Sequence, residues 1–397
     1  MASDERILET IPAGTLGLIP LESIQKMGEK VDNFLVQWRS KREHDHCDDS
    51  AYQGYYRDSY RLKAYCPRFG TGEAKGVIKE SVRGYDLFLM VDVTNHSLTY
   101  SLFGKENRMS PDDHYADLKR IIAAVGGKAR RITVIIPFLY ESRQHKRTSR
   151  ESLDCAIALQ ELVTMGVDNI ITFDAHDPRV QNAIPLKGFD TVQPAYQFIK
   201  GILKRDKDLI IDNDHMMVIS PDEGGTNRAV YLSNVLGLDM GMFYKRRDYS
   251  KIVNGRNPIV AHEFLGSSVE GKDVLIIDDM ISSGDSMIDV ATELKERKAN
   301  RIFVISTFGL FTNGLEKFDK AYKDGIIYRV VTTNLTYQSP ELLDKEYYIN
   351  CDMSKYIAYI IDSLNHDLSI GDLLDPYDRI HKLLDKYRAA QLTDSGK

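Results

Sequence analysis

Two adjacent carboxylates, Asp278 and Asp279, follow directly on an apolar run of the sequence. The next small residues along the chain are Ser282, Ser283, Gly284 and Ser286. If a helix starts here, its first backbone N–H groups point at an anion, and the helix dipole and the hydroxyls assist them. The two carboxylates suit the 2- and 3-hydroxyls of a ribose, or a Mg²⁺ ion that bridges them. The segment is therefore compatible with a sugar-phosphate site, and equally with a strand followed by a serine-capped helix.

The elements on both sides of these residues are also visible in the sequence. Residues 274–277 predict a buried strand. Met287, Ala291 and Leu294 recur at i, i+4 and i+7, which predicts a helix with one apolar face. In open α/β sheets, ligands gather at the carboxyl ends of the strands. The polar residues that follow each apolar run are therefore the first candidates for function.

Alternating strands and helices are predicted from residue 85 onward. The helix at 110–127, for example, has Ser110 as its cap and Gly126-Gly127 as its end. Continuous apolar runs separated by helices indicate parallel sheets that are covered on both faces. Two such series follow one another, so we predict an α/β fold with two domains. The runs lie at 86–93, 131–140 and 169–176, and then at 216–225, 239–247, 274–287, 301–311, 326–334 and 347–352.

The length and composition of the chain limit its class. Its 397 residues are enough for two α/β domains and an extension. A content of 43% hydrophobic and 28% charged residues is typical of globular proteins. The formal net charge of −6 argues against a general nucleic-acid binder, so local basic clusters have to hold any anionic substrate.

Targeting signals and cysteine use favour a soluble, cytoplasmic protein. The first residues lack the basic-then-apolar layout of a signal peptide, and the longest apolar stretch, near 132–140, is about half as long as a membrane span. The cysteines lie far apart without a CxxC motif, which is more typical of reduced thiols than of a disulfide framework or a zinc site. They are Cys47, Cys66, Cys155 and Cys351.

The first 60 residues show no strong period, and we predict an N-terminal extension of unknown role at 1–60. His44, His46 and Cys47 lie close together in it and invite a metal-site interpretation. One short cluster without a second pair of ligands is, however, more typical of a solvated polar segment.

The segment 274–295 resembles the phosphoribosyl-diphosphate-binding signature of type I phosphoribosyltransferases and of ribose-phosphate pyrophosphokinases. Further segments, in colinear order over roughly residues 65 to 375, resemble the pyrophosphokinases in particular. The resemblance implies two tandem type I phosphoribosyltransferase-like domains with parallel sheets flanked by helices. We place these domains at 61–200 and 201–375, with the ribose-phosphate loop in the second and a C-terminal tail at 376–397.

Two segments resemble the parts of the family that bind ATP. In the first, 67–88, the resemblance implies that Phe69 stacks on adenine and that Thr71 and Glu73 lie near the base or the ribose. In the second, 134–147, it implies that Arg143 and Gln144 contact ATP. Without the resemblance, a glycine-turned hairpin and a solvated basic turn would explain these two segments.

Three more segments resemble parts that hold metal, phosphate and the departing nucleotide. The resemblance implies that His176 touches Mg·ATP and that Asp222 helps to hold Mg²⁺, with Gly224-Gly225 letting the backbone approach a phosphate. It also implies that Lys245 and Arg247 are the cations of a mobile catalytic loop.

The implied reaction is the transfer of pyrophosphate from Mg·ATP to the C1 hydroxyl of ribose 5-phosphate, which gives phosphoribosyl diphosphate and AMP. Mg²⁺ is the implied cofactor and ATP the co-substrate, and the implied assembly is a dimer-based homo-oligomer such as a hexamer. We expect neither nucleic acid nor a membrane as partner.

The family pattern is not followed everywhere. Gly70-Thr71 replace a serine and an aspartate, His145 replaces an aspartate, and Asp177 replaces a small residue. Asp285 stands where the phosphate loop usually has glycine. Either its side chain points away from the phosphate as a helix-start residue, or the acceptor is a different ribose compound such as ADP-ribose. A phosphoribosyltransferase and a non-catalytic regulatory paralogue stay open as alternatives.

Overall fold

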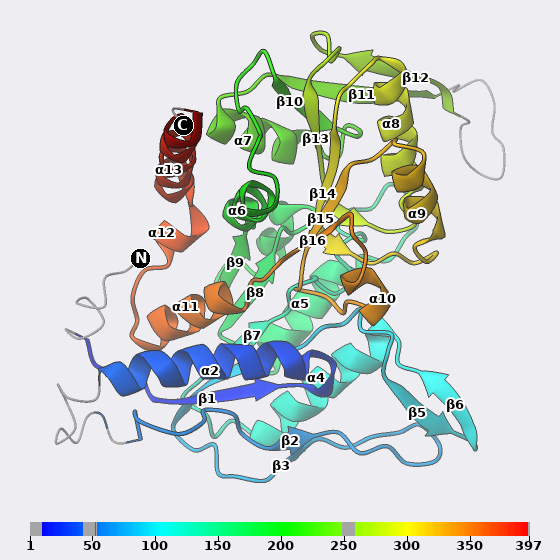
Figure 1. The fold of residues 1–397 in the computed structure, drawn as a ribbon. Helices are drawn as coiled ribbons and strands as arrows, with labels where there is room; N and C mark the ends of the chain where they lie inside the picture. The colour runs from blue at the N-terminus through cyan, green and yellow to red at the C-terminus, as the bar shows by residue number, and fades with distance from the viewer. Residues whose placement is uncertain (1–9, 43–51, 53, 248–258, 396–397) are drawn as a thin grey trace. The chain divides into compact units, whose positions relative to one another are not determined.

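The computed structural model describes residues 10–42, 52, 54–247 and 259–395, with the backbone alone for 245–247, 259–262 and 392–395 (Figure 1). The chain forms two compact α/β units. Unit 1 comprises Met1–Gln193, Asn334–Tyr337 and Asp352–Asp375. Unit 2 comprises Pro194–Thr333, Gln338–Cys351 and Pro376–Lys397. This division differs from the predicted boundaries, because the chain returns to unit 1 near its end and the predicted tail belongs to unit 2.

Unit 1 is built on a five-stranded sheet in the order β1-β4-β7-β8-β9, in which all neighbours are parallel. Its strands are β1 (Thr15–Pro20), β4 (Tyr85–Met90), β7 (Arg131–Ile135), β8 (Asn169–Phe173) and β9 (Gly188–Val192). Strands β4, β7 and β8 are the apolar runs of the first predicted series. Strand β1 lies in the segment for which no element was predicted, and it pairs with β4 along its whole length.

The N-terminal segment also contributes the helix α2 (Gln25–Lys41), which packs against α11 (Ser354–Asn365). The rings of Trp38 and Tyr359 stack between these two helices, with their centroids 4.3 Å apart. The guanidinium of Arg39 donates to Asp362 at 3.0 Å, and that of Arg42 donates to the same carboxylate at 2.7 Å. The described part of residues 1–60 is therefore an integral part of unit 1.

The remaining elements of unit 1 are short helices and two small antiparallel pairs. Helix α4 starts at the predicted cap, because Ser110 and Asp113 form a reciprocal capping box, and it ends at Gly126 in the left-handed region at φ 59°. The helices are η1 (Glu22–Ile24), α4 (Pro111–Val125), α5 (Asp154–Thr164), η3 (Pro178–Ala183) and α12 (Gly371–Leu374). The pairs are β2 (Ala64–Tyr65) with β3 (Val77–Ile78), and β5 (Thr99–Leu102) with β6 (Lys105–Arg108).

Unit 2 contains a seven-stranded sheet in the order β12-β11-β10-β13-β14-β15-β16. Only the pair of β11 with the edge strand β12 is antiparallel within this described sheet. The strands are β10 (Met216–Ser220), β11 (Met240–Arg247), β12 (Ile259–Leu265), β13 (Asp273–Ile281), β14 (Ile302–Gly309), β15 (Arg329–Thr333) and β16 (Tyr348–Cys351). The parallel strands correspond to the second predicted series.

Helices cover both faces of this sheet (Figure 1). Along β13, Leu275 and Ile277 belong to one buried cluster, whereas Val274 and Ile276 belong to another. This alternation places α6 (Ala195–Arg205), α7 (Thr226–Leu236) and α13 (Tyr377–Ser395) on one face. It places α8 (Asp285–Glu296), α9 (Glu316–Lys323) and α10 (Pro340–Leu343) on the other. The α/β prediction with parallel, doubly covered sheets is therefore confirmed.

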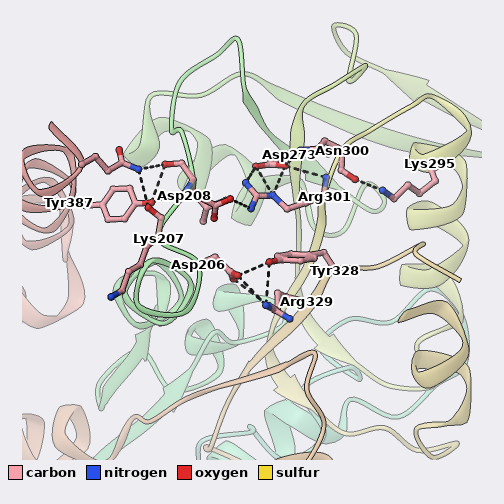
Figure 2. A network of polar contacts seen from close by, with 12 residues as sticks. Asp206, Lys207, Asp208, Asp273, Lys295, Asn300, Arg301, Tyr328, Arg329 and Tyr387 are labelled. Carbon is pink, nitrogen blue, oxygen red and sulfur yellow. Dashed lines mark hydrogen bonds and ion pairs between the residues drawn. The ribbon is translucent and has the colours of Figure 1, made fainter. Parts of the chain in front are cut away.

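Figure 2 shows a polar network at the amino-terminal ends of β13, β14 and β15. Arg301, just before β14, binds Asp273 at the start of β13, with Nη2 and Oδ2 2.7 Å apart. Arg329, at the start of β15, contacts Asp206 at 3.1 Å, and the hydroxyl of Tyr387 in α13 accepts a backbone N–H at 3.0 Å. These groups tie the strands to the helices at the end opposite to the paired carboxylates. The network is structural, and the carboxyl ends of the strands are left for function.

Candidate active site

The paired carboxylates lie in the carboxyl-terminal half of β13. The strand continues to Ile281, so Asp278 and Asp279 are strand residues and do not follow the strand as predicted. Asp279 is only 3% exposed, and its backbone N–H donates to Oδ1 of Asp278 at 2.9 Å. Asp278 is paired in register with Ser306 of β14. The neighbouring strand fixes the position of both carboxylates.

A third carboxylate interacts with this pair. Burial raises the pKa of Asp278 well above its usual range, and the charges of Asp279 and Asp222 raise it further. Asp222 lies in the loop after β10, where it accepts the backbone N–H of Gly224 at 2.9 Å. One cation lies close by, because Nη2 of Arg228 is 3.8 Å from Oδ2 of Asp279. The adjacent carboxyl ends of β10 and β13 therefore hold an acidic cluster of Asp222, Asp278 and Asp279.

The donor set of this acidic cluster is chemically suited to Mg²⁺. Carboxylate oxygens are the ligands that Mg²⁺ prefers. Burial is the main cause of the raised pKa of Asp278, and the neighbouring charges of Asp279 and Asp222, which raise it further, are charges that a cation would balance. No group of three or more His, Cys, Asp or Glu side chains in the described parts of the chain is arranged to hold a metal ion by itself. Mg²⁺ commonly keeps several waters and binds one or two carboxylates together with substrate phosphates, so the residues present fit the ion.

The segment of small residues forms the predicted turn into a helix. Gly284 has a φ of 84°, and a Cβ atom at this position would lie 2.3 Å from Cζ of Phe318 in α9. Only glycine is compatible with both the dihedral angle and the close approach. Helix α8 starts directly after Gly284, with Asp285 as its first residue and with Ser286 exposed. The carbonyl of Ser282 accepts the backbone N–H of Thr312 at 2.9 Å, which anchors the turn.

The unusual Asp285 is paired with a lysine. Its carboxylate, about half exposed, contacts Nζ of Lys317 in α9, and this hydrogen bond lowers the pKa of Asp285. Lys317 was not identified from the sequence, because it lies 32 residues further along the chain and only the fold brings it to the start of α8. The negative charge that Asp285 adds beside the helix N-terminus is therefore balanced locally.

Two other departures from the family pattern contact each other in unit 1. Nε2 of His145, in the loop after β7, lies 3.5 Å from Oδ2 of Asp177, in the loop after β8. Hydrogen bonds from Arg179 lower the pKa of Asp177 to about 2, so this carboxylate is ionised at neutral pH. The ring of His176 lies beside that of His145, with the two centroids 5.3 Å apart. The two substitutions form one interacting pair next to the predicted metal histidine.

The predicted nucleotide residues of unit 1 lie on two exposed loops. Phe69 is 52% exposed on a tight turn, in which its N–H donates to the carbonyl of Glu73 at 2.7 Å. The hydroxyl of Thr71 donates to the carboxylate of Glu73 at 2.9 Å. Arg143 is exposed, and the side-chain amide of Gln144 donates to the carbonyl of residue 152 at 2.8 Å. Gln144 therefore closes its own loop in this structure.

The predicted catalytic cations lie at the end of β11. The backbone of Lys245 is paired with His262 of β12 and that of Arg247 with Ile259, while their side chains are outside the described part of the structure. The histidine and cysteine cluster at 44–47 also lies outside the described residues.

Comparison with known proteins gives the family. The N-terminal domain of ribose phosphate pyrophosphokinase matches residues 18–166, and the phosphoribosyl transferase domain matches residues 190–342. A ribose-phosphate pyrophosphokinase of Shewanella oneidensis is 29% identical, over 77% of this chain and 88% of its own length. One of Vibrio parahaemolyticus is 28% identical, over 78% of this chain and 90% of its own length. The chain belongs to the ribose-phosphate pyrophosphokinase family.

Membership of the ribose-phosphate pyrophosphokinase family confirms the prediction of an enzyme, a transferase of nucleotide biosynthesis. The fold agrees as well. A phosphoribosylpyrophosphate synthetase from Mycobacterium smegmatis has a similar structure, with a TM-score of 0.68 at 20% identity over 89% of this chain and 99% of that one. The match to the N-terminal family domain includes the second half of β1 and all of α2. Among the described residues, no helix combines the length and the apolar character needed to cross a membrane.

Proposed function

We propose that the chain transfers the pyrophosphoryl group of Mg·ATP to the C1 hydroxyl of ribose 5-phosphate, releasing AMP. The observation that carries this proposal is the acidic cluster of Asp222, Asp278 and Asp279 next to the glycine turn that starts α8. Carboxylates that accept hydrogen bonds from two ribose hydroxyls, beside a helix start that receives the phosphate, are what a phosphorylated pentose requires.

The residues divide the work between sugar, phosphates and nucleotide. Asp278 and Asp279 orient the ribose through its hydroxyls, while the turn at 282–286 receives the 5-phosphate. A Cβ at Gly225 would lie 2.9 Å from Oγ of Ser220, so glycine lets this loop pack closely against the end of β10. Gly224-Gly225 stay the predicted place where the backbone approaches a phosphate. Asp222 and His176 stay the predicted holders of Mg²⁺, which when bound neutralises charge on the phosphates.

Charge neutralisation on the departing AMP is assigned to Lys245, Arg247 and Arg143. Pyrophosphoryl transfer needs little covalent assistance, so positioning and charge carry the rate. The contacts predicted for ATP itself are unchanged, and they are Phe69, Thr71, Glu73 and Gln144. The cytoplasmic location and the homo-oligomeric assembly also stay predictions.

The test is AMP formation by the purified chain with Mg·ATP, in the presence and absence of ribose 5-phosphate. Sugar-dependent AMP supports the proposal. Release of pyrophosphate from phosphoribosyl diphosphate with a base would indicate a phosphoribosyltransferase, and the absence of both activities would indicate a regulatory paralogue.

Lys245→Ala should lower turnover more than tenfold with an unchanged thermal unfolding midpoint, because one lost donor typically costs ~3–4 kcal/mol of barrier. Lys204→Ala, an exposed lysine of α6, is the matched control.

ADP-ribose stays the alternative acceptor, because Asp285 places a carboxylate at the start of α8, although Lys317 balances its charge. The same assay with ADP-ribose in place of ribose 5-phosphate measures it. A higher kcat/KM with ADP-ribose would show that ADP-ribose, and not ribose 5-phosphate, is the preferred acceptor. The assignment of the chain as a pyrophosphokinase would be unaffected.

A further inference from the structure

The hairpin of β5 and β6 has an unusual residue at its tip. Leu102 and Lys105 form its last pair, so Phe103 and Gly104 make a two-residue turn, with φ angles of 46° and 75°. Positive φ at both positions is typical of a type I′ turn, in which Asn, Asp or Gly is favoured at the first position. A phenylalanine is sterically disfavoured there. The ring is also 79% exposed, so neither turn chemistry nor burial accounts for it.

The hairpin is braced against the predicted adenine-binding loop. The N–H of Phe103 donates to the carbonyl of Gly70 at 2.9 Å. A Cβ atom at Gly72 would lie 2.7 Å from Cδ1 of Leu102, so the loop and the hairpin are in close contact. The guanidinium of Arg68 lies over the hairpin ring of Tyr100 at 4.9 Å. Two exposed phenylalanines, Phe69 and Phe103, are therefore presented by two segments that support each other.

We propose that Phe103 is a further nucleobase-binding residue, which forms with Phe69 an aromatic surface for the purine of the nucleoside triphosphate. The inference rests on the proposed use of ATP and adds a residue outside the two segments that resemble the ATP-binding parts of the family. Flat aromatic side chains stack on bases with useful affinity at partly exposed sites. The polar groups of Thr71 and Glu73 lie on the same loop as Phe69 and are hydrogen-bonded to each other at 2.9 Å. The proposal assigns them the edge of the base.

The experiment separates the base from the phosphates. Phe103→Asn keeps the turn, because Asn is favoured at this position, and it removes the ring. Phe103→Tyr keeps the ring. Dissociation constants of ATP and of inorganic tripolyphosphate, both with Mg²⁺, are measured by calorimetry. Phe103→Asn should weaken ATP binding about fivefold or more and leave tripolyphosphate binding unchanged, while Phe103→Tyr binds like the wild type. Leu186→Asn, which replaces a 95% exposed leucine of the same unit, is the control.

Three outcomes overturn the inference. The first is unchanged ATP binding by Phe103→Asn, and the second is an equal loss of ATP and tripolyphosphate binding. The third is a changed sedimentation mass without a changed ATP affinity, which would make Phe103 a contact between copies of the chain. The proposed reaction is judged separately. If ATP binding depends on Phe103 but no AMP forms with ribose 5-phosphate, only the reaction is wrong. If AMP forms and the KM for ATP is unaffected by Phe103→Asn, only this inference is wrong.

Discussion

Single charged residues determine how an anionic ligand can be held at the start of α8. The turn at Gly284 exposes backbone N–H groups, yet the first residue of the helix is an aspartate. Lys317 balances this charge from the neighbouring helix α9. A carboxylate and a sugar phosphate can therefore share the same helix start, provided that the lysine is present.

Replacing Lys317 by alanine should raise the KM for ribose 5-phosphate about threefold at low ionic strength, because Asp285 then repels the phosphate. The KM for ATP should change less. In steady-state kinetics, the double variant with Asp285→Gly should recover the wild-type value, and Lys320→Ala on the same helix is the control. An equal rise of KM for Lys320→Ala would show that general surface charge, and not this pair, is responsible.

The acidic cluster should cost stability in the absence of ligand. The pKa of Asp278 is raised in the folded state, so ionisation disfavours folding once the pH exceeds the ordinary aspartate value near 4. Asp278→Asn should therefore raise the thermal unfolding midpoint by a few degrees at pH 7.5. The gain should shrink as the pH falls toward 4 and vanish below it, where the wild-type carboxyl becomes protonated in both states. Asp289→Asn, an exposed carboxylate of α8, should show no such pH dependence; a gain of equal size at both pH values would contradict the prediction.

At the scale of elements, the contact between α2 and α11 depends on one buried carboxylate. Asp362 is 1% exposed and serves both Arg39 and Arg42, which hold its pKa below the ordinary value although burial alone would raise it. The stacked rings of Trp38 and Tyr359 add apolar contact to the same pair of helices. The helices are therefore joined by a buried ion cluster.

Asp362→Asn should destabilise unit 1 by about 3–5 kcal/mol, because two buried guanidinium groups lose the charge that balances them. Chemical denaturation followed by the fluorescence of Trp38, the single tryptophan, measures the loss at this contact. Asp367→Asn removes an exposed ion pair with Arg131 and should cost much less. Equal losses for both variants would show that burial of the Asp362 cluster is not the cause.

At the scale of the whole molecule, the elements that could be predicted are those with a local pattern in the sequence. The strands β4, β7, β8 and β13 could be predicted because their apolar runs are buried on both faces. Strand β1 could not, because its apolar run is interrupted by Gly17, where a Cβ would lie 2.7 Å from Cδ2 of Leu87. Helix α2 was missed because its buried side includes Asp32 and Arg39, and charged residues look solvent-exposed until their distant partners are known.

In the candidate site, too, only residues that form a local pattern in the sequence could be predicted. Adjacent residues such as Asp278, Asp279 and the small-residue turn form a local pattern that the sequence displays directly. The pairs Asp285 with Lys317 and His145 with Asp177 form only through the fold. The sequence therefore showed Asp285, His145 and Asp177 as three unrelated departures and gave no sign of Lys317. Arg228 of helix α7 was overlooked for the same reason, since its carboxylate partner Asp279 is on strand β13.

The partners of the buried ion cluster are synthesised near opposite ends of the chain. Arg42 and Asp362 are 320 residues apart, yet they meet inside the same unit. At ribosomal rates of about 5–20 residues per second, α2 emerges tens of seconds before the helix that covers it. During that interval the side of α2 that packs against α11 is uncovered, and its two arginines lack the carboxylate of Asp362, although Tyr55 beside them has already been made. The buried ion cluster is therefore completed only near the end of synthesis. A nascent chain stalled before residue 352 should be cleaved by protease within α2, and one released after residue 375 should resist.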